Sequence, residues 1–441
     1  MKIPRRNIFK GLAASLGWMA MGKAAGAADV RLAKPPAVSR GNGPDPLYVK
    51  PMPVTMAELK ARKAPGASVA EVSDYLPVGY SGPLTPCPPH ADMNPHHAAI
   101  VTWEGKPHRF IFSHEASYVP AMELPNGVGL CNQFFEGNTG DELFNDLGRR
   151  TRNSFVNILQ SGPERAWVRW NYFCVNKDDD TRIALKGTED YIAYPNGLMW
   201  RRLTYETMMP DSPEGYSWQP IDFFAWVPNG SEWKDILNRD EEHGDYHVAT
   251  VVDAFSDKRY DKFWDDNGKA RRIGDAALLL EISHSRGLAM ILPTKAGNLF
   301  TILGEASGFP SAKSQVVDHS FNDTGGWGWG PIRWDHWPVG WLNSEGNNYK
   351  PGVSKYPYHY GPLSHYIVSH PLKNCGEFPM EDANNDYHKE TLNMEHNRWA
   401  ERHVYYTLTG AAKDIESIRK LARQWLEKGH ACATPESIAG L

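Results

Sequence analysis

Alternating apolar and polar residues, interrupted by hairpin turns, restrict the fold of this chain more than any other feature. The segment 165–173 alternates in this way, which is typical of a strand with one buried face. The turn Asn196-Gly197 separates two further strand-like segments, 191–194 and 198–205, and Asn-Gly is a strong hairpin signal. Strands that are joined by hairpins pair antiparallel, so we expect large antiparallel sheets.

The rest of the pattern favours an all-β fold. Further strands are expected at 98–103, 109–112, 221–226, 277–283, 289–293 and 299–303. One long helix is expected near the C-terminus, at 413–428, where five apolar residues share a face: Ile415, Ile418, Leu421, Ala422 and Trp425. Helices do not alternate with strands, no fixed repeat is visible, and no glycine-rich phosphate loop follows a strand. We therefore predict a large antiparallel two-sheet sandwich, of the super-sandwich kind, with an N-terminal extended arm and one C-terminal helix.

The N-terminus resembles a twin-arginine export signal. Arg5-Arg6 is followed by a short apolar run, 11–22, and by a small-residue cleavage pattern that ends at Ala27. The run is shorter than the roughly 20 apolar residues that span a bilayer. We predict a signal peptide over 1–27, twin-arginine export to the periplasm or beyond, and no membrane association after cleavage. A Pro/Gly-rich arm is expected over 28–96, with a short helix near 56–62, and a β-sandwich catalytic domain over 97–430.

The amino-acid composition favours some classes of function and argues against others. The chain holds 16 Trp, 19 Tyr and 16 Phe, and aromatic rings suit both β-structure and stacking on sugar rings. The net charge is −5 and no basic block occurs, so nucleic acid is not an expected partner. Five cysteines form no C-x-x-C pair, which argues against a cysteine zinc site or a redox motif. Buried thiols are expected at Cys131 and Cys174.

The densest group of polar and aromatic residues lies in the irregular segment 325–366. Long irregular segments often carry functional groups on a rigid scaffold. Arg333 can hold a carboxylate through two parallel hydrogen bonds. The segment also supplies acid/base groups and aromatic rings: Trp334, His336, Trp337, Tyr358, His359 and Tyr360. The alternative is a loop that packs its rings on the sandwich, with hydrogen bonds that serve only structure.

Three smaller groups are also candidates. Tyr118, Asn132 and Gln133 follow predicted strands, where they could orient a sugar hydroxyl or a uronic carboxylate, or could simply cap strand ends. We expect them to line one cleft with the segment 325–366. The other two groups contain potential metal ligands, with polar loops as the alternative: His90, Asp92, His96 and His97, and the alternating run His243, Asp245 and His247, expected on one side of a strand. No cofactor is predicted, and a structural metal ion remains an open alternative.

Short segments across about three quarters of the chain together resemble a poorly characterised family of secreted β-sandwich proteins from polysaccharide-degrading bacteria. The matching segments are 110–112, 117–120, 129–136, 165–173, 194–197, 335–339, 357–359, 407–410 and 413–425. The resemblance extends to super-sandwich polysaccharide lyases and mutarotase-like domains, and implies the fold more than the reaction. The chain departs from the family pattern at 113–115, where a Trp-Arg-Gly-like triplet is expected, and at 360–362, where small hydroxyl residues are expected.

The leading functional hypothesis is a polysaccharide lyase that cleaves a uronic-acid-containing glycan by β-elimination. Arg333 with Asn132 and Gln133 would stabilise the charge on the uronate carboxylate. His336 or His359 would be the base, and Tyr118, Tyr358 or Tyr360 the acid, with Trp334 and Trp337 as further sugar contacts. One alternative is a glycoside hydrolase acting through Asp335 or Glu345 with Glu115 or Glu136, although the sequence singles out no carboxylate pair. The other is a non-catalytic carbohydrate-binding sandwich protein. No G-x-S-x-G elbow is present, so serine hydrolase chemistry is not indicated.

Overall fold

The structure is a computed structural model, and the part of it that can be described belongs to one compact unit, Met52–Leu441. The residues that the structure describes are 52–76, 78, 96–114, 118–131, 136–137, 154–175, 183–207, 217–228, 231, 233–267, 269–304, 315–318, 361–371, 402–428 and 432–441.

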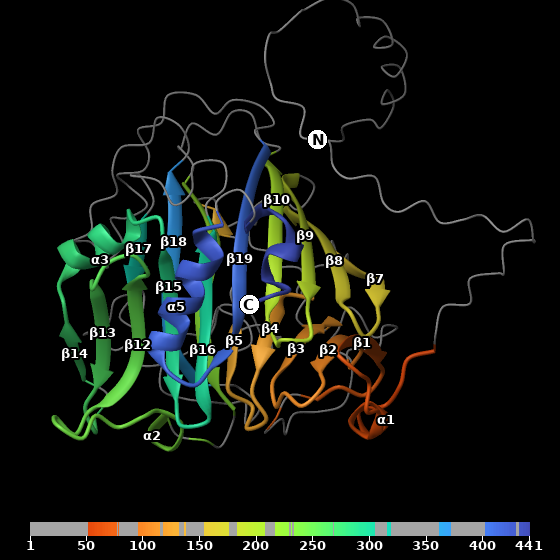
Figure 1. Ribbon diagram of the computed structural model, residues 1–441, viewed down its shortest axis with the longest axis horizontal. Coiled ribbons are helices and arrows are strands. Elements are labelled where there is room, and N and C mark those ends of the chain that lie inside the picture. The colour runs from red at the N-terminus through yellow and green to blue at the C-terminus, as the bar shows by residue number, and fades with distance from the viewer. Residues whose placement is uncertain are drawn as a thin grey trace, which may run out of the picture. The chain divides into compact units, whose positions relative to one another are not determined.

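Two large antiparallel sheets make up the fold, as the alternating pattern predicts (Figure 1). In the described residues, sheet A has nine strands, and β6 (Glu136–Gly137) pairs with β11 beside the main path. The order along that path is β1 (Ala67–Val72), β2 (Ala98–Trp103), β3 (Arg109–Ser113), β4 (Pro120–Glu123), β5 (Gly129–Cys131), β11 (Ser217–Val227), β18 (Gly361–Pro371) and β17 (Gln315–Asp318).

Sheet B has ten described strands. Their order is β14 (Ala270–Ile273), β13 (Arg259–Trp264), β12 (Tyr246–Asp253), β15 (Leu288–Thr294), β16 (Gly297–Gly304), β19 (Arg402–Ala412), β10 (Met199–Thr207), β9 (Ile183–Ala193), β8 (Ala166–Val175) and β7 (Ser154–Ser161). The predicted hairpin is confirmed, because β9 pairs with β10 around Asn196-Gly197, and Gly197 adopts φ +91° as this turn requires.

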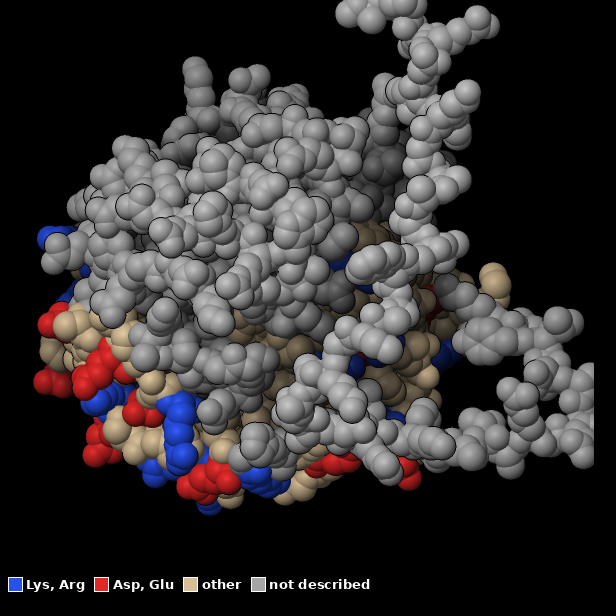
Figure 2. All heavy atoms as spheres, turned by 90° about the horizontal axis from the view of Figure 1, so that it is seen from above, with Lys and Arg blue, Asp and Glu red and all other residues tan. Residues whose placement is uncertain are grey.

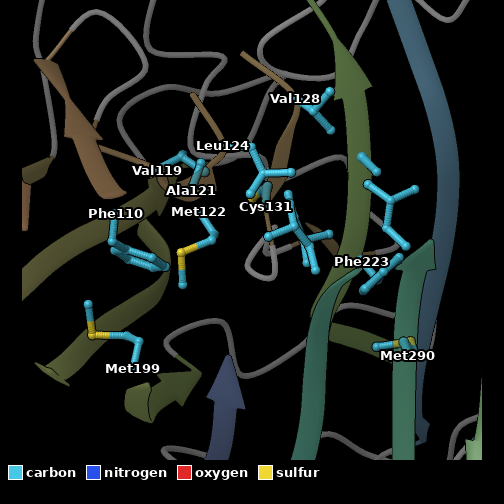
Figure 3. Packing of buried hydrophobic residues seen from close by; sticks show 14 of the residues in the cluster. Phe110, Val119, Ala121, Met122, Leu124, Val128, Cys131, Met199, Phe223 and Met290 are labelled. Carbon is cyan, nitrogen blue, oxygen red and sulfur yellow. The ribbon is translucent and has the colours of Figure 1, made fainter. Parts of the chain in front are cut away.

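The sheets pack face to face over one hydrophobic core. Phe110 and Met122 of sheet A and Met199 of sheet B belong to the same buried cluster (Figure 3). Aromatic side chains of β8 and β9, among them Trp170 and Tyr191, fill the same layer and are fully buried. Cys131 lies in this core as a free thiol, as expected, and Cys432 is a second buried free thiol. The alternating strands therefore place their apolar side chains between two sheets, which is the definition of a sandwich.

Helices cover parts of both outer faces. α5 (Ile415–Leu426) buries Ile418, Ala422 and Trp425 against the outer face of sheet B, on the side predicted from their spacing. Asp414 caps this helix by accepting a hydrogen bond from the backbone of Ser417. On sheet A, α1 (Met56–Ala61) packs Leu59 against β1 and β2. The other described helices are α2 (Trp233–Ile236), α3 (Ala276–Ser283) and the 3₁₀ helix η5 (Pro435–Ile438).

Two sequence expectations need correction or extension. The segment 277–283 was predicted as a strand, but it forms helix α3, whose Leu279 and Ile282 enter the core between the sheets. Asp275 begins this helix by accepting a hydrogen bond from the backbone of Leu278. The segment that was predicted as an arm contains α1, as expected, and also β1, which pairs with β2. Sheet A therefore begins before residue 97, and Ile438 packs against sheet B beyond residue 430.

Basic and acidic side chains are interspersed over the described surface that Figure 2 shows, along its lower edge. They do not gather into a block of one sign on this face. Among the described helices, none combines the length and the apolar character that crossing a bilayer requires.

Candidate functional site

Among the residues that the lyase hypothesis assigns to the site, Tyr118 is the one that the structure describes. The others lie outside the described residues: Asn132, Gln133, Arg333, Trp334, His336, Trp337, Tyr358, His359 and Tyr360. Strand β18, which follows Tyr360, begins at Gly361 opposite Val227, whereas Tyr118 lies at the other end of sheet A, beside the end of β5. A cleft shared by Tyr118 and the segment 325–366 stays a prediction.

Three strand ends bring Tyr118 together with two histidines. His97 directly precedes β2, His114 directly follows β3, and Tyr118 precedes β4. β4 is the neighbour of β3 in the sheet. The backbone N–H of His114 donates to the carbonyl of His97 at 2.8 Å, which extends the β2–β3 ladder past its last residue. The backbone N–H of Tyr118 donates to the carbonyl of Ser113, also at 2.8 Å. The backbone therefore fixes all three side chains at one end of sheet A.

Tyr118 has an unusual backbone conformation. Its φ is +63°, and it is the only non-glycine residue in the described part of the chain with a positive φ. This left-handed conformation costs an L-residue about 1–2 kcal/mol, because its Cβ crowds the following carbonyl oxygen. Strained residues of this kind cluster at active sites and ligand clamps, where the surrounding structure holds them in place. The strain therefore marks Tyr118 as a candidate functional residue.

The side chains form a chain of three acid/base groups: a carboxylate, an imidazole and a phenol. The hydroxyl of Tyr118 lies 3.3 Å from Nδ1 of His97. The other ring nitrogen of His97, Nε2, lies 3.7 Å from Oε2 of Glu71 on β1. A carboxylate at this distance favours a proton on Nε2, which leaves Nδ1 to accept the phenol hydrogen. We call these three residues with His114 the Tyr118 cluster.

His114 packs against both aromatic partners. Its ring centroid lies 5.2 Å from that of Tyr118 and 6.3 Å from that of His97. His114 is 4% exposed, and the side chains of His97 and Glu71 are 20% and 12% exposed, so the cluster is screened from bulk water but not sealed from it. Electrostatic effects are stronger in such a partly buried place than at the surface. The Tyr118 cluster can thus hold a proton on the phenol, beside an imidazole that can relay a replacement proton to it.

A second polar cluster lies inside the sandwich, and no sequence pattern singled it out. Glu189 accepts hydrogen bonds from the hydroxyls of Tyr172 and Tyr191, at 2.8 and 2.5 Å, and from Nε of Arg201 at 2.6 Å. The side chains of Glu189 and Arg201 are at most 1% exposed. Gly187 makes room for this interior cluster, because a Cβ there would lie 2.1 Å from the ring of Tyr172. We call these four hydrogen-bonded residues the interior network.

Burial shapes the acid/base properties of the interior network. Burial raises the pKa of Tyr191 well above its ordinary value. Burial alone would lower the pKa of Arg201, but the charge of Glu189, its hydrogen bond with Arg201 and the phenols of Tyr191 and Tyr172 together raise that pKa. Arg201 therefore stays charged and Tyr191 stays neutral at any ordinary pH. These are the properties of structural groups rather than of groups that exchange protons.

The two predicted histidine clusters are arranged differently from the expectation. His243 lies in a turn before β12, and His247 lies on β12, so the run 243–247 does not project from one side of a strand. His97 belongs to the Tyr118 cluster, while its predicted partners His90 and Asp92 lie outside the described residues. Within the described ranges, no group of three or more potential ligands is placed to hold a metal ion.

Glu71 is the member of the Tyr118 cluster that sequence reasoning missed. It lies on β1, in the segment that was predicted as an arm, and faces His97 because β1 pairs with β2 in the register Glu71↔Ala99. No local pattern in the sequence indicates this pairing across the intervening residues. Comparison with known proteins gives no further assignment: neither a family model nor a curated protein matches the chain.

Proposed function

We propose that the protein is an exported polysaccharide lyase that cleaves a uronic-acid-containing glycan by β-elimination, with Tyr118 as the acid. The observation that carries the proposal is the phenol of Tyr118, held in a left-handed backbone conformation with its hydroxyl on Nδ1 of His97. β-Elimination needs an acid for the leaving oxygen and does not need a pair of carboxylates. The Tyr118 cluster supplies such an acid on a β-sandwich scaffold.

The reaction requires one base, one acid and one stabilising contact. The base removes the proton at C5 of the uronate, and the electron pair forms the double bond between C4 and C5. The bond between C4 and the glycosidic oxygen breaks, and the acid protonates that oxygen. In this proposal Arg333, with Asn132 and Gln133, stabilises the charge that builds on the uronate carboxylate, and His336 or His359 is the base.

Tyr118 donates its phenol proton to the leaving oxygen. The phenolate then regains a proton from solvent through His97, whose Nδ1 contacts the phenol oxygen: the imidazole first takes up a proton on Nδ1 and then passes it to Tyr118. Glu71 stabilises the protonated imidazole, because its carboxylate lies 3.7 Å from Nε2. His114 is a positioning residue, whose ring packs on Tyr118 and limits its rotation. Each group thus has one role that follows from its contacts.

The test is turnover of a panel of uronate polysaccharides by the chain that follows the proposed cleavage site at Ala27. Ultraviolet absorbance of the unsaturated product and the release of reducing ends are followed together. A lyase produces both signals in parallel. Reducing ends without absorbance would indicate a glycoside hydrolase, and binding without either signal would indicate a carbohydrate-binding protein. Either of these two results would reject the proposed reaction.

A matched pair of variants ties turnover to the phenol. Tyr118→Phe removes the hydroxyl that contacts His97 and keeps the ring that packs on His114. Tyr246→Phe is the control, because Tyr246 is a buried tyrosine on sheet B whose ring packs on Trp233, away from the Tyr118 cluster. Loss of turnover in the first variant alone supports Tyr118 as the acid. Equal turnover in both would rule Tyr118 out.

A further inference from the structure

A pocket opens on the outer face of sheet B, over the strands at the edge away from β7. Thr250 pairs with Ile291, and Ile291 packs under α5, so Thr250 and its partner across the strand, Asp261, lie on the outer face. The cavity measures about 430 Å³, within the range of small-molecule sites. We call it the outer pocket, and its lining residues are Asn238, Arg239, Asp240, His247, Arg259, Asp261, Phe263 and Ile273.

Asp261 is the centre of the outer pocket. Its carboxylate accepts hydrogen bonds from Thr250 at 2.6 Å and contacts Nε2 of His247 at 2.9 Å. Its other oxygen lies 2.6 Å from Nε of Arg259. The side chain of Asp261 is 6% exposed; Arg259 balances its charge, while Thr250 and His247 contact its other oxygen. A buried carboxylate with this many partners serves to fix the groups around it.

Arg259 lines the outer pocket beside Asp261. Its Nε lies 2.6 Å from Oδ2 of Asp261, and its side chain is 37% exposed. Arg239 lines the same pocket. Its Nε donates to the carbonyl of Gly244, and its Nη2 lies 3.7 Å from Oδ2 of Asp266. A guanidinium that is held at Nε presents two parallel N–H donors, which match the two oxygens of a carboxylate. The outer pocket therefore offers a preformed carboxylate receptor.

The remaining lining suits the rest of a sugar residue. Asn238 and Asp240 supply a side-chain amide and a carboxylate, which hydrogen-bond hydroxyl groups. Ile273 is 47% exposed and offers an apolar surface to C–H groups. The ring of Phe263 already stacks with the imidazole of His247, and the guanidinium of Arg271 lies over it. Phe263 therefore supports the pocket and does not stack on a ligand.

The charges around the outer pocket disfavour a doubly negative ligand relative to a singly negative one. Three arginines face four aspartates there: Arg239, Arg259 and Arg271, with Asp240, Asp245, Asp261 and Asp266. Two histidines, His243 and His247, contact Asp240 and Asp261. Aspartates in the wall would repel a doubly charged phosphate more strongly than a monoanionic carboxylate.

We infer that the outer pocket binds one acidic sugar residue, with the uronate carboxylate on Arg259 and the ring hydroxyls on Asn238 and Asp240. It is a second glycan contact, on the sheet opposite the one that carries the Tyr118 cluster. The inference rests on the proposed function only in taking the glycan as the source of the ligand. Its role is to retain the polymer on the protein, because the acid/base groups of its described lining, Asp240, His247 and Asp261, each contact an internal partner.

Binding of free monosaccharides tests the inference without any turnover, since a lyase has no glycosidic bond to cleave in them. Calorimetric titration with glucuronate and galacturonate is compared with glucose, galactose and inorganic phosphate. We expect the two uronates to bind and the neutral sugars to bind at least ten-fold more weakly, which corresponds to about 1.4 kcal/mol. Equal binding of neutral sugars, equal binding of phosphate, or no binding of uronates to folded protein would each overturn the inference.

Variants locate the binding. Arg259→Gln and Arg259→Lys should each weaken uronate binding at least ten-fold, because both remove the paired donors while Lys keeps the charge. Arg239→Gln, at a side chain that is 55% exposed, tests the pocket without disturbing Asp261. Arg286→Gln is the control, since its guanidinium lies over Phe255, outside the pocket lining. Unchanged affinity in all three pocket variants would overturn the inference.

Turnover separates this inference from the proposed reaction. If both hold, Arg259→Gln leaves kcat on short oligosaccharides unchanged and raises KM for the polymer. If the reaction proposal fails, no variant shows turnover, but uronate still binds at the outer pocket. If the pocket inference fails, Tyr118→Phe still abolishes turnover while uronate binding does not depend on Arg259.

Discussion

The Tyr118 cluster and the interior network contain the same kinds of residue and use them in opposite ways. Each holds a glutamate, at least one tyrosine hydroxyl and a basic side chain. In the interior network, both oxygens of Glu189 are occupied by donors and every member is fully buried. In the Tyr118 cluster, the phenol lies on a strained backbone at the end of a sheet. Full burial around a carboxylate whose two oxygens both have donors makes a network rigid, whereas a partly open, strained cluster keeps groups available for reaction.

The largest expected effect is on stability, from breaking the interior network. Glu189→Gln leaves the guanidinium of Arg201 buried without its counter-charge, so we expect the free energy of unfolding to fall by about 3–5 kcal/mol. Chemical denaturation measures it. Activity per folded molecule should not change, because this network takes no part in the proposed reaction.

A double variant provides the control for that result. Combining Glu189→Gln with Arg201→Met removes both charges, and a buried charge pair that is replaced by uncharged groups often costs little. The double variant should therefore be more stable than Glu189→Gln alone. If the two single losses instead add up in the double variant, Glu189 and Arg201 are not energetically coupled and the interior network is not a unit.

The next largest effect is on activity, from the Tyr118 cluster. Tyr118→Phe should lower kcat on the uronate polymer by at least about 100-fold, the usual range for losing a positioned acid. The melting temperature should change little, because the ring and its packing on His114 remain. A large loss of stability with unchanged turnover per folded molecule would show that Tyr118 belongs with the interior network as a structural group.

A smaller effect on stability distinguishes the backbone conformation at Tyr118 from that at Tyr191. At Tyr118, with φ +63°, the Gly variant should be more stable than the Ala variant by about 1 kcal/mol, because glycine adopts positive φ without strain. At Tyr191, inside strand β9, the order should reverse, with Gly less stable than Ala by about 0.5–1 kcal/mol. Denaturation midpoints of the four variants measure both differences. The same order at both positions would show that Tyr118 is not strained.

The parts of the fold that the sequence predicted are those that local sequence patterns determine. Alternation and the Asn196-Gly197 turn are local, so the two-sheet fold and its central hairpin were predictable. The strand predicted at 277–283 was wrong because a short apolar run does not distinguish a strand from a buried helix. The local signal that was overlooked is Asp275, a good helix N-cap three residues before Leu278.

The site divides in the same way. Tyr118 was predicted because it stands at a strand end, among polar residues that a loop could present. Glu71 was not predicted, because its position beside His97 depends on the pairing of β1 with β2. A long stretch of chain separates these two strands in the sequence. The interior network was missed because Glu189, Tyr191 and Arg201 occupy inward positions in strands, where an alternating pattern leads one to expect apolar residues. Contacts between strands that are distant in sequence produce no periodic pattern from which they could be predicted.

The smallest expected effect is a pH dependence that belongs to Tyr191. Burial raises the pKa of Tyr191 well above its ordinary value, the charge of Arg201 works against this, and the charge of Glu189 reinforces it. A raised pKa in the folded state stabilises the protein below the unfolded pKa, about 10 for tyrosine, and this stability is lost as the pH rises above it. The free energy of unfolding of wild type should therefore approach that of Tyr191→Phe above about pH 10 and keep a constant gap at neutral pH.

Phe112→Leu, at a ring that touches Tyr191 but does not titrate, is the control and should keep its difference in unfolding free energy from wild type at all pH values. If the gap for Tyr191→Phe also stays constant at alkaline pH, the phenol of Tyr191 ionises as readily in the folded chain as in water, and the contrast between the interior network and the Tyr118 cluster does not lie in their acid/base properties.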